Sequence, residues 1–582
     1  MPETTVAPFR GEPKTKRYER LRQSLRTERA SFETVWRDLG DHILPYRVQF
    51  SQSDRNRGDR RNLKIIDSTP SIAARTCASG MHSGMTHPAR PWFKLAPRSK
   101  ALAEAAGVKA WLHDVEEVLN GIFHRSNLYQ VLPVVYADAA VFGVGAMTIH
   151  EDDEDVIRCF DHPIGTYYLA LDAKRRVRVF VEEFSLTVRQ LVEQFGEFGR
   201  DGAVDLSKFS MRVQNLWRNE TFDAWIEVCQ VIEQNRDYNP DRLDSRFKRY
   251  VSCYYEIGGE PDKTLRETGF DEFPTMALRW DVAGNNVYGT NSPGITALGD
   301  CKQLQLGEKR GAQALDKMVN PPMVAPPAAM NVKLSMLPGD VSYVQESERA
   351  QVRAMHEVNL ALDALEAKQE QKRNLIRRAF FEDLFLMMAY TDAQTASAQP
   401  PTATEVQERK EEKFLVLGPV LERSNQDLLG PTIDRTFGIA ARRGLIPSPP
   451  PELEGEELRI EYVSILAQAQ KRVSLAGLDE LAIRVQRMRA AAPEDPSVGD
   501  KFDTDQYFDE LGDTLGVSPR VIRSDEDVAA MRESRAEAQR QAQAVELAER
   551  EAAAAKMLSE TDVEKPSALR LLADGAGRGA AA

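Results

Sequence analysis

The chain has 582 residues, a formal net charge of −13 and 42% hydrophobic residues. This length suggests roughly three to five domains, and the acidity argues against tight binding of nucleic acid, which needs Lys and Arg against the phosphates. No apolar run reaches the roughly 20 residues that span a bilayer, and the N-terminus has no apolar stretch behind its charges, so we expect neither a membrane span nor a secretory signal.

Motifs of common catalytic and ligand sites are missing. The sequence contains no G-x-x-x-x-G-K-[ST], no H-E-x-x-H and no paired cysteines, so we predict no ATP motor, no metal site, no cofactor and no enzyme activity. The five scattered cysteines predict reduced thiols. Gly143 and Gly145 resemble half of a dinucleotide fingerprint, but a strand pattern follows them, which favours a close backbone approach. The acidic run EDDED at 151–155 is either a set of hard-cation ligands or a solvated hairpin turn, and the turn is favoured.

Helix and strand patterns mix in residues 1–285 and predict an α+β body. Apolar residues at spacings of three, four and seven indicate helices, and β-branched runs around turns indicate hairpins. Thr187 before the run VRQLVEQF predicts a capped helix that ends at Gly196. The predicted helices cover residues 15–43, 67–85, 108–123, 128–142 and 187–196. The predicted strands form hairpins over 146–160 and 166–186, a strand at the end of 87–95, and strands over 223–233, 249–257 and 273–281.

Two long helical runs dominate the next part of the chain. The first covers residues 294–319, and the second covers 343–390, which would be about 70 Å long at 1.5 Å per residue. Between them, residues 320–339 read NPPMVAPPAAMNVKLSMLPG, and the loop QTASAQPPTAT follows at 394–404. A pair of long helices with small loops at opposite ends suits a stave in a ring better than a compact enzyme.

Both runs carry features that bear on how they pack. In the second run, residues 366–374 (EAKQEQKRN) interrupt the apolar stripe; such a section is either solvated or in polar contact with neighbours. In the first run, Gly307 and Gly311 predict the close approach of another helix, with a kink or an early helix end as the alternative, because each glycine costs about 1 kcal/mol against alanine. An antiparallel helix pair is the simplest arrangement.

The C-terminal part is predicted to be mostly helical. Residues 444–455 are a turn-rich break, a short strand covers 458–463, and helices continue to about residue 491. A linker over 493–500 precedes helices at 504–515 and 525–558.

Several sequence blocks occur together in a characteristic order. They are WRDLGDHILPYR (36–47), IIDSTPSIAARTCASGMHSGMTHPARPWFKL (65–95), SNLYQVLPVVYADAAVFGVGAM (126–147), HPIGTYYLALD (162–172), TVRQLVEQFG (187–196), NNVYGTNSPGITALGDCKQLQ (285–305), KMVNPPMVAP (317–326), TATEVQER (402–409) and LGPVLERSNQDLLGPTIDRTFGIAARRGLIPSPP (417–450). With these blocks the chain resembles the head-to-tail connector, or portal, proteins of short-tailed podophages, over roughly residues 18–481.

The resemblance implies a predominantly helical α+β fold with the wing, stem, clip and crown regions of portals, long stem helices and small β hairpins. It implies the following division: 1–285, wing; 286–319, first stem helix; 320–342, clip; 343–391, second stem helix running into the wing; 392–404, tunnel loop; 405–480, wing and lower crown; 481–582, crown and C-terminal helical tail.

The resemblance also implies functional residues. The tunnel loop that lines a channel would contain Gln394, Thr395, Ala396, Ser397, Ala398, Gln399, Pro400, Pro401 and Thr402. The clip that docks terminase or the tail would contain Asn320, Pro321, Pro322, Met323, Lys333, Pro338 and Gly339. The polar middle of the second stem helix would meet neighbouring subunits through Glu366, Lys368, Glu370, Lys372 and Arg373.

The implied function is a ring, usually of twelve copies, at one vertex of the virion capsid, assembled in the host cytoplasm. The implied partners are other copies of the chain, the major capsid and scaffolding proteins, the terminase large subunit, the tail adaptor and internal core proteins, and double-stranded DNA that passes through without sequence preference. A non-catalytic nucleic-acid-processing subunit or a coiled-coil scaffold is the alternative. A nuclease or terminase would show a P-loop or a carboxylate cluster beside a strand, and a coiled coil would keep its heptads through 366–374.

Overall fold

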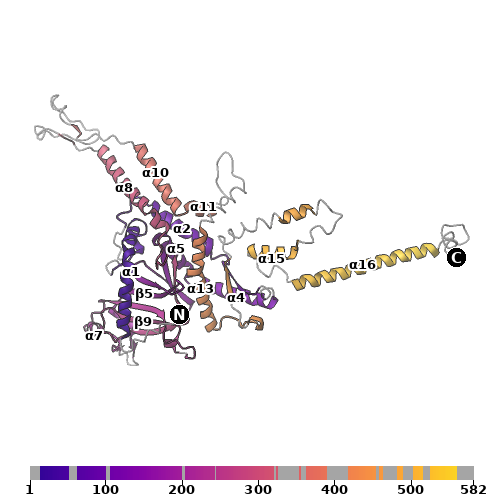
Figure 1. Cartoon of the computed structure of the whole chain (residues 1–582), viewed down its shortest axis with the longest axis horizontal. Helices are drawn as coiled ribbons and strands as arrows, with labels where there is room; N and C mark the ends of the chain where they lie inside the picture. Colours follow the sequence, from indigo (N-terminus) through magenta and orange to yellow (C-terminus); the bar gives the residue numbers. More distant parts are fainter. Residues whose placement is uncertain are drawn as a thin grey trace, which may run out of the picture. The chain divides into compact units, whose positions relative to one another are not determined.

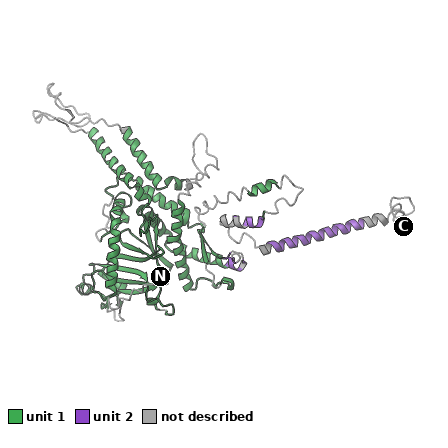
Figure 2. Ribbon diagram, viewed as in Figure 1, with its two compact units in different colours: residues 1–98, 111–502 green, residues 99–110, 503–582 purple. Residues whose placement is uncertain are grey.

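In the computed structural model of the chain, the longer strands lie between residues 144 and 279, and mostly helices follow (Figure 1). The structure describes residues 13–51, 62–99, 102, 105–198, 204–242, 244–319, 323–324, 353–354, 362–389, 417–453, 458–462, 481–488, 502–515 and 525–559. Two compact units contain them: residues 1–98 with 111–502, and residues 99–110 with 503–582 (Figure 2). The predicted α+β class with a large helical share is confirmed.

The largest sheet of the first unit is antiparallel, with strand order β10-β9-β8-β5-β4. Its strands are β4 (Tyr167–Leu171), β5 (Val177–Thr187), β8 (Trp225–Gln234), β9 (Tyr250–Glu256) and β10 (Arg266–Phe270). Helix α1 (Lys14–His42) contributes Tyr18 and Leu25 to a buried cluster with Val181, Val231 and Cys253 of this sheet. The pattern of alternating strand residues therefore places one sheet face beneath the N-terminal helix.

A second hydrophobic cluster lies where helices α6 (Val188–Phe195) and α7 (Met211–Arg218) pack against β8. Thr187 and Gln190 form the reciprocal hydrogen bonds of a capping box, and Gly196 ends α6. The predicted cap and end of this helix are both confirmed. A short strand pair, β6 (Glu197–Phe198) with β7 (Val204–Asp205), follows α6.

A three-stranded sheet of order β11-β2-β3 forms the centre of the unit, with strands β2 (Val144–Asp152), β3 (Val156–His162) and β11 (Thr275–Arg279). The buried helix α5 (Leu128–Phe142) leads directly into β2 through Gly143, whose φ is +84°. A Cβ on Gly143 would lie 2.5 Å from the carbonyl oxygen of Gly289, and one on Gly145 would collide with the carbonyl oxygen of Val135. Both glycines therefore mark close backbone approaches, as predicted.

Helices surround this centre. They are α2 (Thr69–Met85), which packs on α5, and α13 (Gly430–Arg442), with a π-helical turn at Asn425–Leu429 just before it. Helix α4 (Ala106–Arg125) packs near β1, through Phe123 and Glu116. Short 3₁₀ turns lie at Pro45–Arg47, Ser245–Phe247 and Pro451–Leu453. Strands β1 (Phe93–Pro97) and β14 (Leu458–Tyr462) pair antiparallel although more than 350 residues separate them, with Leu95 opposite Ile460.

The second unit contains α15 (Thr504–Leu515) and α16 (Asp525–Ser559), which match the two predicted C-terminal helices. Arg532 of α16 donates to both carboxylate oxygens of Asp505 of α15, at 2.7 and 2.8 Å. The two side chains are 60% and 41% exposed, so this pair contributes only modestly to stability.

All five cysteines are free and buried, as predicted. Burial raises the pKa of Cys77, Cys159 and Cys301 to about 12, so these thiols are unreactive at neutral pH. Among the described residues, no helix is long and apolar enough to cross a membrane.

The prediction of one unbroken helix over 343–390 is wrong in two places. Arg353–Ala354 form a strand, β13, that pairs antiparallel with β12 (Met323–Val324). Farther on, the helix stops at Ala379, and Phe381 has a φ of +56°, which an α-helix does not tolerate. The described helices in this range are α10 (Leu362–Ala379) and α11 (Glu382–Ala389).

Candidate functional site

The feature that stands apart from the body is the pair formed by α8 (Pro293–Val319) and α10, which extend side by side away from the sheets (Figure 1). We call it the helix pair. The base of α8 is tied to α5: the Ser292 hydroxyl donates to the carbonyl of Val141 at 3.0 Å, and Gly294 is so close to that carbonyl that no larger residue fits. The pair therefore begins from the most deeply buried part of the body.

Along the pair, the two helices approach closely at the predicted glycines. A Cβ on Gly311 would lie 3.1 Å from Leu365 and 3.4 Å from Gln369. α8 continues to Val319 without interruption, so the close-approach prediction is confirmed and the alternative of an early helix end is wrong.

Ion pairs join the two helices of the pair to each other, and one of them also joins α10 to the body. Lys372 contacts Asp300 at 2.7 Å, and Arg373 contacts Asp67 at 2.8 Å and Glu308 at 2.6 Å. Burial acts to raise the pKa of Asp67, but hydrogen bonds from Thr69 and Arg373 outweigh it and hold that pKa below its usual value. Lys372 and Arg373, predicted to contact neighbouring subunits, thus have partners within their own chain.

The other residues of the polar section, 366–374, are partly buried against α8 and partly exposed. Gln369 is buried against α8, which corrects the idea that the section has no buried face. Glu366, Lys368 and Glu370 are exposed, and Glu370 also contacts Arg377 at 3.1 Å. Their assignment to a subunit contact stays a prediction.

The break after α10 turns the chain back onto the body. Phe385 of α11 lies against Gly80 of α2, where a Cβ would overlap its ring, and Phe381 stacks on Trp280 with ring centroids 6.5 Å apart. The predicted tunnel-loop residues, Gln394 to Thr402, follow α11 and lie outside the described residues.

At the far end of the helix pair, the only predicted clip residue in the described part of the chain is Met323, in β12. Asn320, Pro321, Pro322, Lys333, Pro338 and Gly339 lie outside it. Because β12 pairs with β13 at 353–354, the segment between the two helices is longer than the predicted 320–342.

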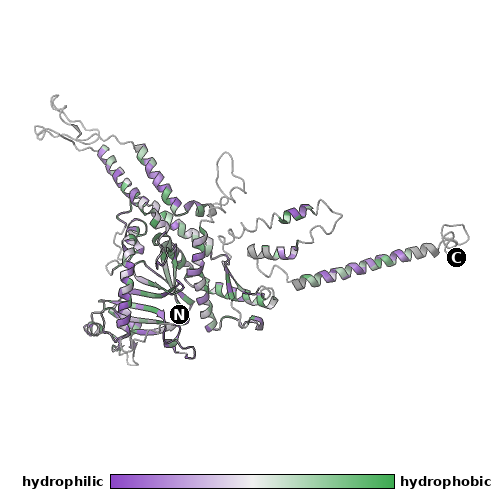
Figure 3. Cartoon of the chain, in the orientation of Figure 1, coloured by the Kyte–Doolittle hydropathy of each residue, from purple (hydrophilic) through white to green (hydrophobic). Residues whose placement is uncertain are grey.

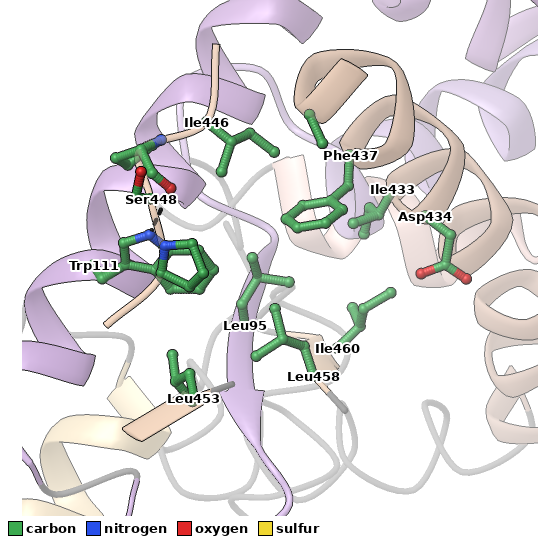
Figure 4. A pocket seen from close by; sticks show the side chains of 13 residues that line it. Leu95, Trp111, Ile433, Asp434, Phe437, Ile446, Ser448, Leu453, Leu458 and Ile460 are labelled. Atoms are coloured by element: carbon green, nitrogen blue, oxygen red, sulfur yellow. Dashed lines mark hydrogen bonds between the residues drawn. The ribbon is translucent and has the colours of Figure 1, made fainter. Parts of the chain in front are cut away.

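A mostly apolar pocket of about 610 Å³ lies elsewhere, between α13, the loop at 446–449 and the β1–β14 pair (Figure 4). Trp111 closes one side by donating its indole N–H to the carbonyl of Pro447 at 2.9 Å. Phe437, Leu95 and Ile460 point into it. No local sequence pattern predicts this pocket, since residues from three distant segments line it.

The acidic turn at 151–155 is held by arginines of α13 and its end. Glu151 contacts Arg442 at 3.0 Å, and Asp153 contacts Arg443 at 3.3 Å. No cluster of three or more potential metal ligands occurs among the described residues. The turn is therefore an ion-paired hairpin connection in this structure.

Comparison with known proteins decides the family. The profile described as "Bacteriophage head to tail connecting protein" matches residues 15–522. The chain belongs to this family. The head to tail connecting proteins include the portal protein of Salmonella phage epsilon15, which is 45% identical over 95% of this chain and 97% of its own length. They also include the probable portal protein of Bordetella phage BPP-1, 39% identical over 94% of this chain and 95% of its own length.

Among solved structures, the neck of an empty gene transfer agent particle is similar over 77% of this chain and 90% of that one, with a TM-score of 0.32 and 10% identity. A virion of a native gene transfer agent matches over 75% and 99%, with a TM-score of 0.30 and 10% identity. As a head to tail connecting protein, the chain is a portal protein and a component of the virion.

Proposed function

We propose that this portal protein forms a closed ring, of about twelve copies as the resemblance implies, in which the helix pair is the stem. The observation that carries the proposal is the helix pair itself. It extends from the body, and large apolar residues on it, among them Leu306 and Leu375, are 47% and 41% exposed. Its outer faces mix polar and apolar residues (Figure 3). Isolated helices with such faces gain stability when neighbours cover them.

The body then corresponds to the wing, and the segment between α8 and α10, with its β12–β13 pair, to the clip. We assign docking of the terminase large subunit and of the tail adaptor to this clip, including Asn320, Met323 and Lys333. The support is that this segment connects the ends of α8 and α10 that lie away from the body (Figure 1).

The loop at 394–404 is proposed to line the channel. It follows α11, which packs on α2 of the body through Phe385 and Gly80. Its small, neutral side chains, such as Thr395 and Ser397, form no ion pair with phosphate, and the chain as a whole is acidic. Double-stranded DNA can then slide past without strong attachment.

The other proposed partners are the major capsid and scaffolding proteins around the body and the internal core proteins. No catalytic role is proposed, because force for packaging comes from the docked terminase ATPase in this scheme.

Mass photometry of the purified full chain tests the ring. We expect a dominant species near twelve times the mass of the 65.3 kDa chain. A strictly monomeric species at every salt concentration would contradict the proposal.

Deleting residues 394–404 is expected to leave the rings intact and to impair DNA packaging or retention in particles.

A further inference from the structure

Two opposite faces of the helix pair carry complementary features. We propose that the face of α8 that points away from α10 docks on the outer face of α10 in a second copy of the chain, so that Leu306 enters a hollow beside Gln371 and Lys309 and Arg310 meet Asp363 and Glu366. This inference rests on the proposed ring and specifies which surfaces close it.

The hollow is on α10. It is a shallow and open depression of about 470 Å³, lined within the described residues by α10 alone, through Ala367, Glu370, Gln371, Asn374, Leu375 and Arg378. At 100° per residue, Ala367 and Gln371 lie on the side of α10 opposite Leu365 and Gln369, which face α8. The small side chain of Ala367 leaves room there for an apolar side chain from outside.

The matching projection is on α8. Leu306 and Lys309 lie on the side of α8 opposite Leu304 and Gly311, and the Leu306 side chain is 47% exposed. In the described part of the chain, Lys309, Arg310 and Gln313 of this face are all exposed. One turn closer to the body, Lys302 on the same side contacts Asp38 of α1 at 2.5 Å.

Exposed charges of opposite sign lie on the two helices, and α10 also carries the exposed basic residues Lys368 and Arg378. Lys309 and Arg310 are basic, Asp363 and Glu366 are acidic, and all four are exposed. Within the residues that the structure describes, none of the four forms an ion pair, whereas Lys372 and Arg373 on the inner side do. Lys309 and Arg310 of one copy can therefore pair with Asp363 and Glu366 of a neighbouring copy.

The heights of the two faces also agree. Lys372 contacts Asp300, Arg373 contacts Glu308, and Gly311 meets Leu365, so Leu306 is level with about residue 371. Lys309 and Arg310 are level with about residues 366–369, and Asp363 lies about one helical turn farther toward the tip. Rotation about a ring axis along the helix pair keeps each residue at its own height, so these groups meet between neighbours. The contact joins two different faces, as a closed ring with head-to-tail subunits requires.

Charge reversal tests the contact in the full chain. One variant carries Lys309→Glu and Arg310→Glu, and the other carries Asp363→Lys and Glu366→Lys. Each alone places like charges at every interface, and we expect the fraction of chains in rings to fall about tenfold or more by mass photometry, a loss of about 1.4 kcal/mol per tenfold. A 1:1 mixture should assemble again, because alternating copies restore opposite charges.

The matched control reverses two exposed arginines of α7, Arg212→Glu with Arg218→Glu, and should assemble as the unmodified chain does. A second measurement uses Leu306→Cys with Gln371→Cys. Since the native cysteines are buried, oxidation should give a ladder of covalent multimers, and either single substitution should give none.

Three outcomes would overturn the inference: rings from each reversed variant alone, no rescue in the mixture although both variants keep the unmodified unfolding midpoint, or no ladder. In the first case, the proposed ring stands and only the docking surface is wrong. Absence of rings from the unmodified chain would instead contradict the proposed function.

Discussion

The body and the helix pair are stabilised in different ways. In the body, charged groups are paired inside the chain: Arg47 contacts the buried Asp138, and Arg279 contacts Asp427 at 2.9 Å with little exposure. On the outer faces of the helix pair, Lys309 and Glu366 are exposed with no ion pair among the described residues. This difference agrees with the proposed ring, in which neighbouring copies would cover the outer faces of the helix pair.

The largest expected effect is at the junction of α5 and β2. Gly143→Ala should lower the free energy of unfolding of the body by about 3 kcal/mol, since it adds a Cβ against the carbonyl of Gly289 and imposes a positive φ on alanine. Urea unfolding followed by circular dichroism measures this. Gly299→Ala is the control, because a Cβ there meets nothing within 4 Å; equal stability of the two variants would show that the junction is not tightly packed.

A pH effect is expected from Glu116 of α4, which accepts a hydrogen bond from the Leu95 backbone N–H at 2.6 Å. Burial raises its pKa to about 7. A carboxyl whose pKa is higher in the folded state destabilises that state as pH rises from about 4.5 to 7, and the loss is complete above 7. Glu116→Gln keeps the hydrogen-bond acceptor and should raise stability by about 1–3 kcal/mol at pH 8.

The same substitution should change little at pH 4.5. Thermal unfolding at the two pH values provides the comparison, and an equal gain at both would exclude titration of Glu116 as the cause.

A larger side chain at a tightly packed glycine of the helix pair should impair ring assembly rather than the stability of the body. Gly311→Leu inserts a side chain where Leu365 is only 3.1 Å from a Cβ, so the helices must separate. We expect the unfolding midpoint of the body to shift by less than about 1 kcal/mol in free energy, while rings become fewer or change in diameter by electron microscopy. A large loss of stability with normal rings would contradict this account, because it would show that packing in the helix pair stabilises the single chain and not the ring.

The smallest effect is expected from Arg373→Gln at the base of the pair. Its ion pairs with Asp67 and Glu308 are partly exposed, so the loss should be about 1 kcal/mol or less and should shrink at high salt. Lys368→Gln, at an exposed residue of the same helix, is the control and should have no measurable effect on urea unfolding.

Local signals in the sequence were sufficient for much of the body. The Thr187 cap, the end of α6 at Gly196 and the limits of α5 depend on neighbouring residues, and each agreed with the structure. The close approach at Gly311 followed from a spacing of four residues. The blocks between residues 36 and 450 were sufficient to indicate the family.

Contacts between segments that are far apart in the chain could not be predicted from local sequence patterns. The β1–β14 pair, the pocket beside Trp111 and the contact of Arg373 with Asp67 each join segments far apart in the chain. The break at Phe381 was missed because its helical pattern continues on both sides, and packing of Phe385 on Gly80 overrides local preference there. The two-residue strand β13 is too short to leave a periodic signal.

A reconstruction of the assembled ring by electron cryomicroscopy tests the central claim most directly. The account predicts α8 and α10 of every copy as staves around an axial channel, with α8 of one copy against α10 of the next at the level of Leu306 and Gln371. A ring in which the helix pairs point outward and do not touch one another, or the absence of any ring, would contradict it.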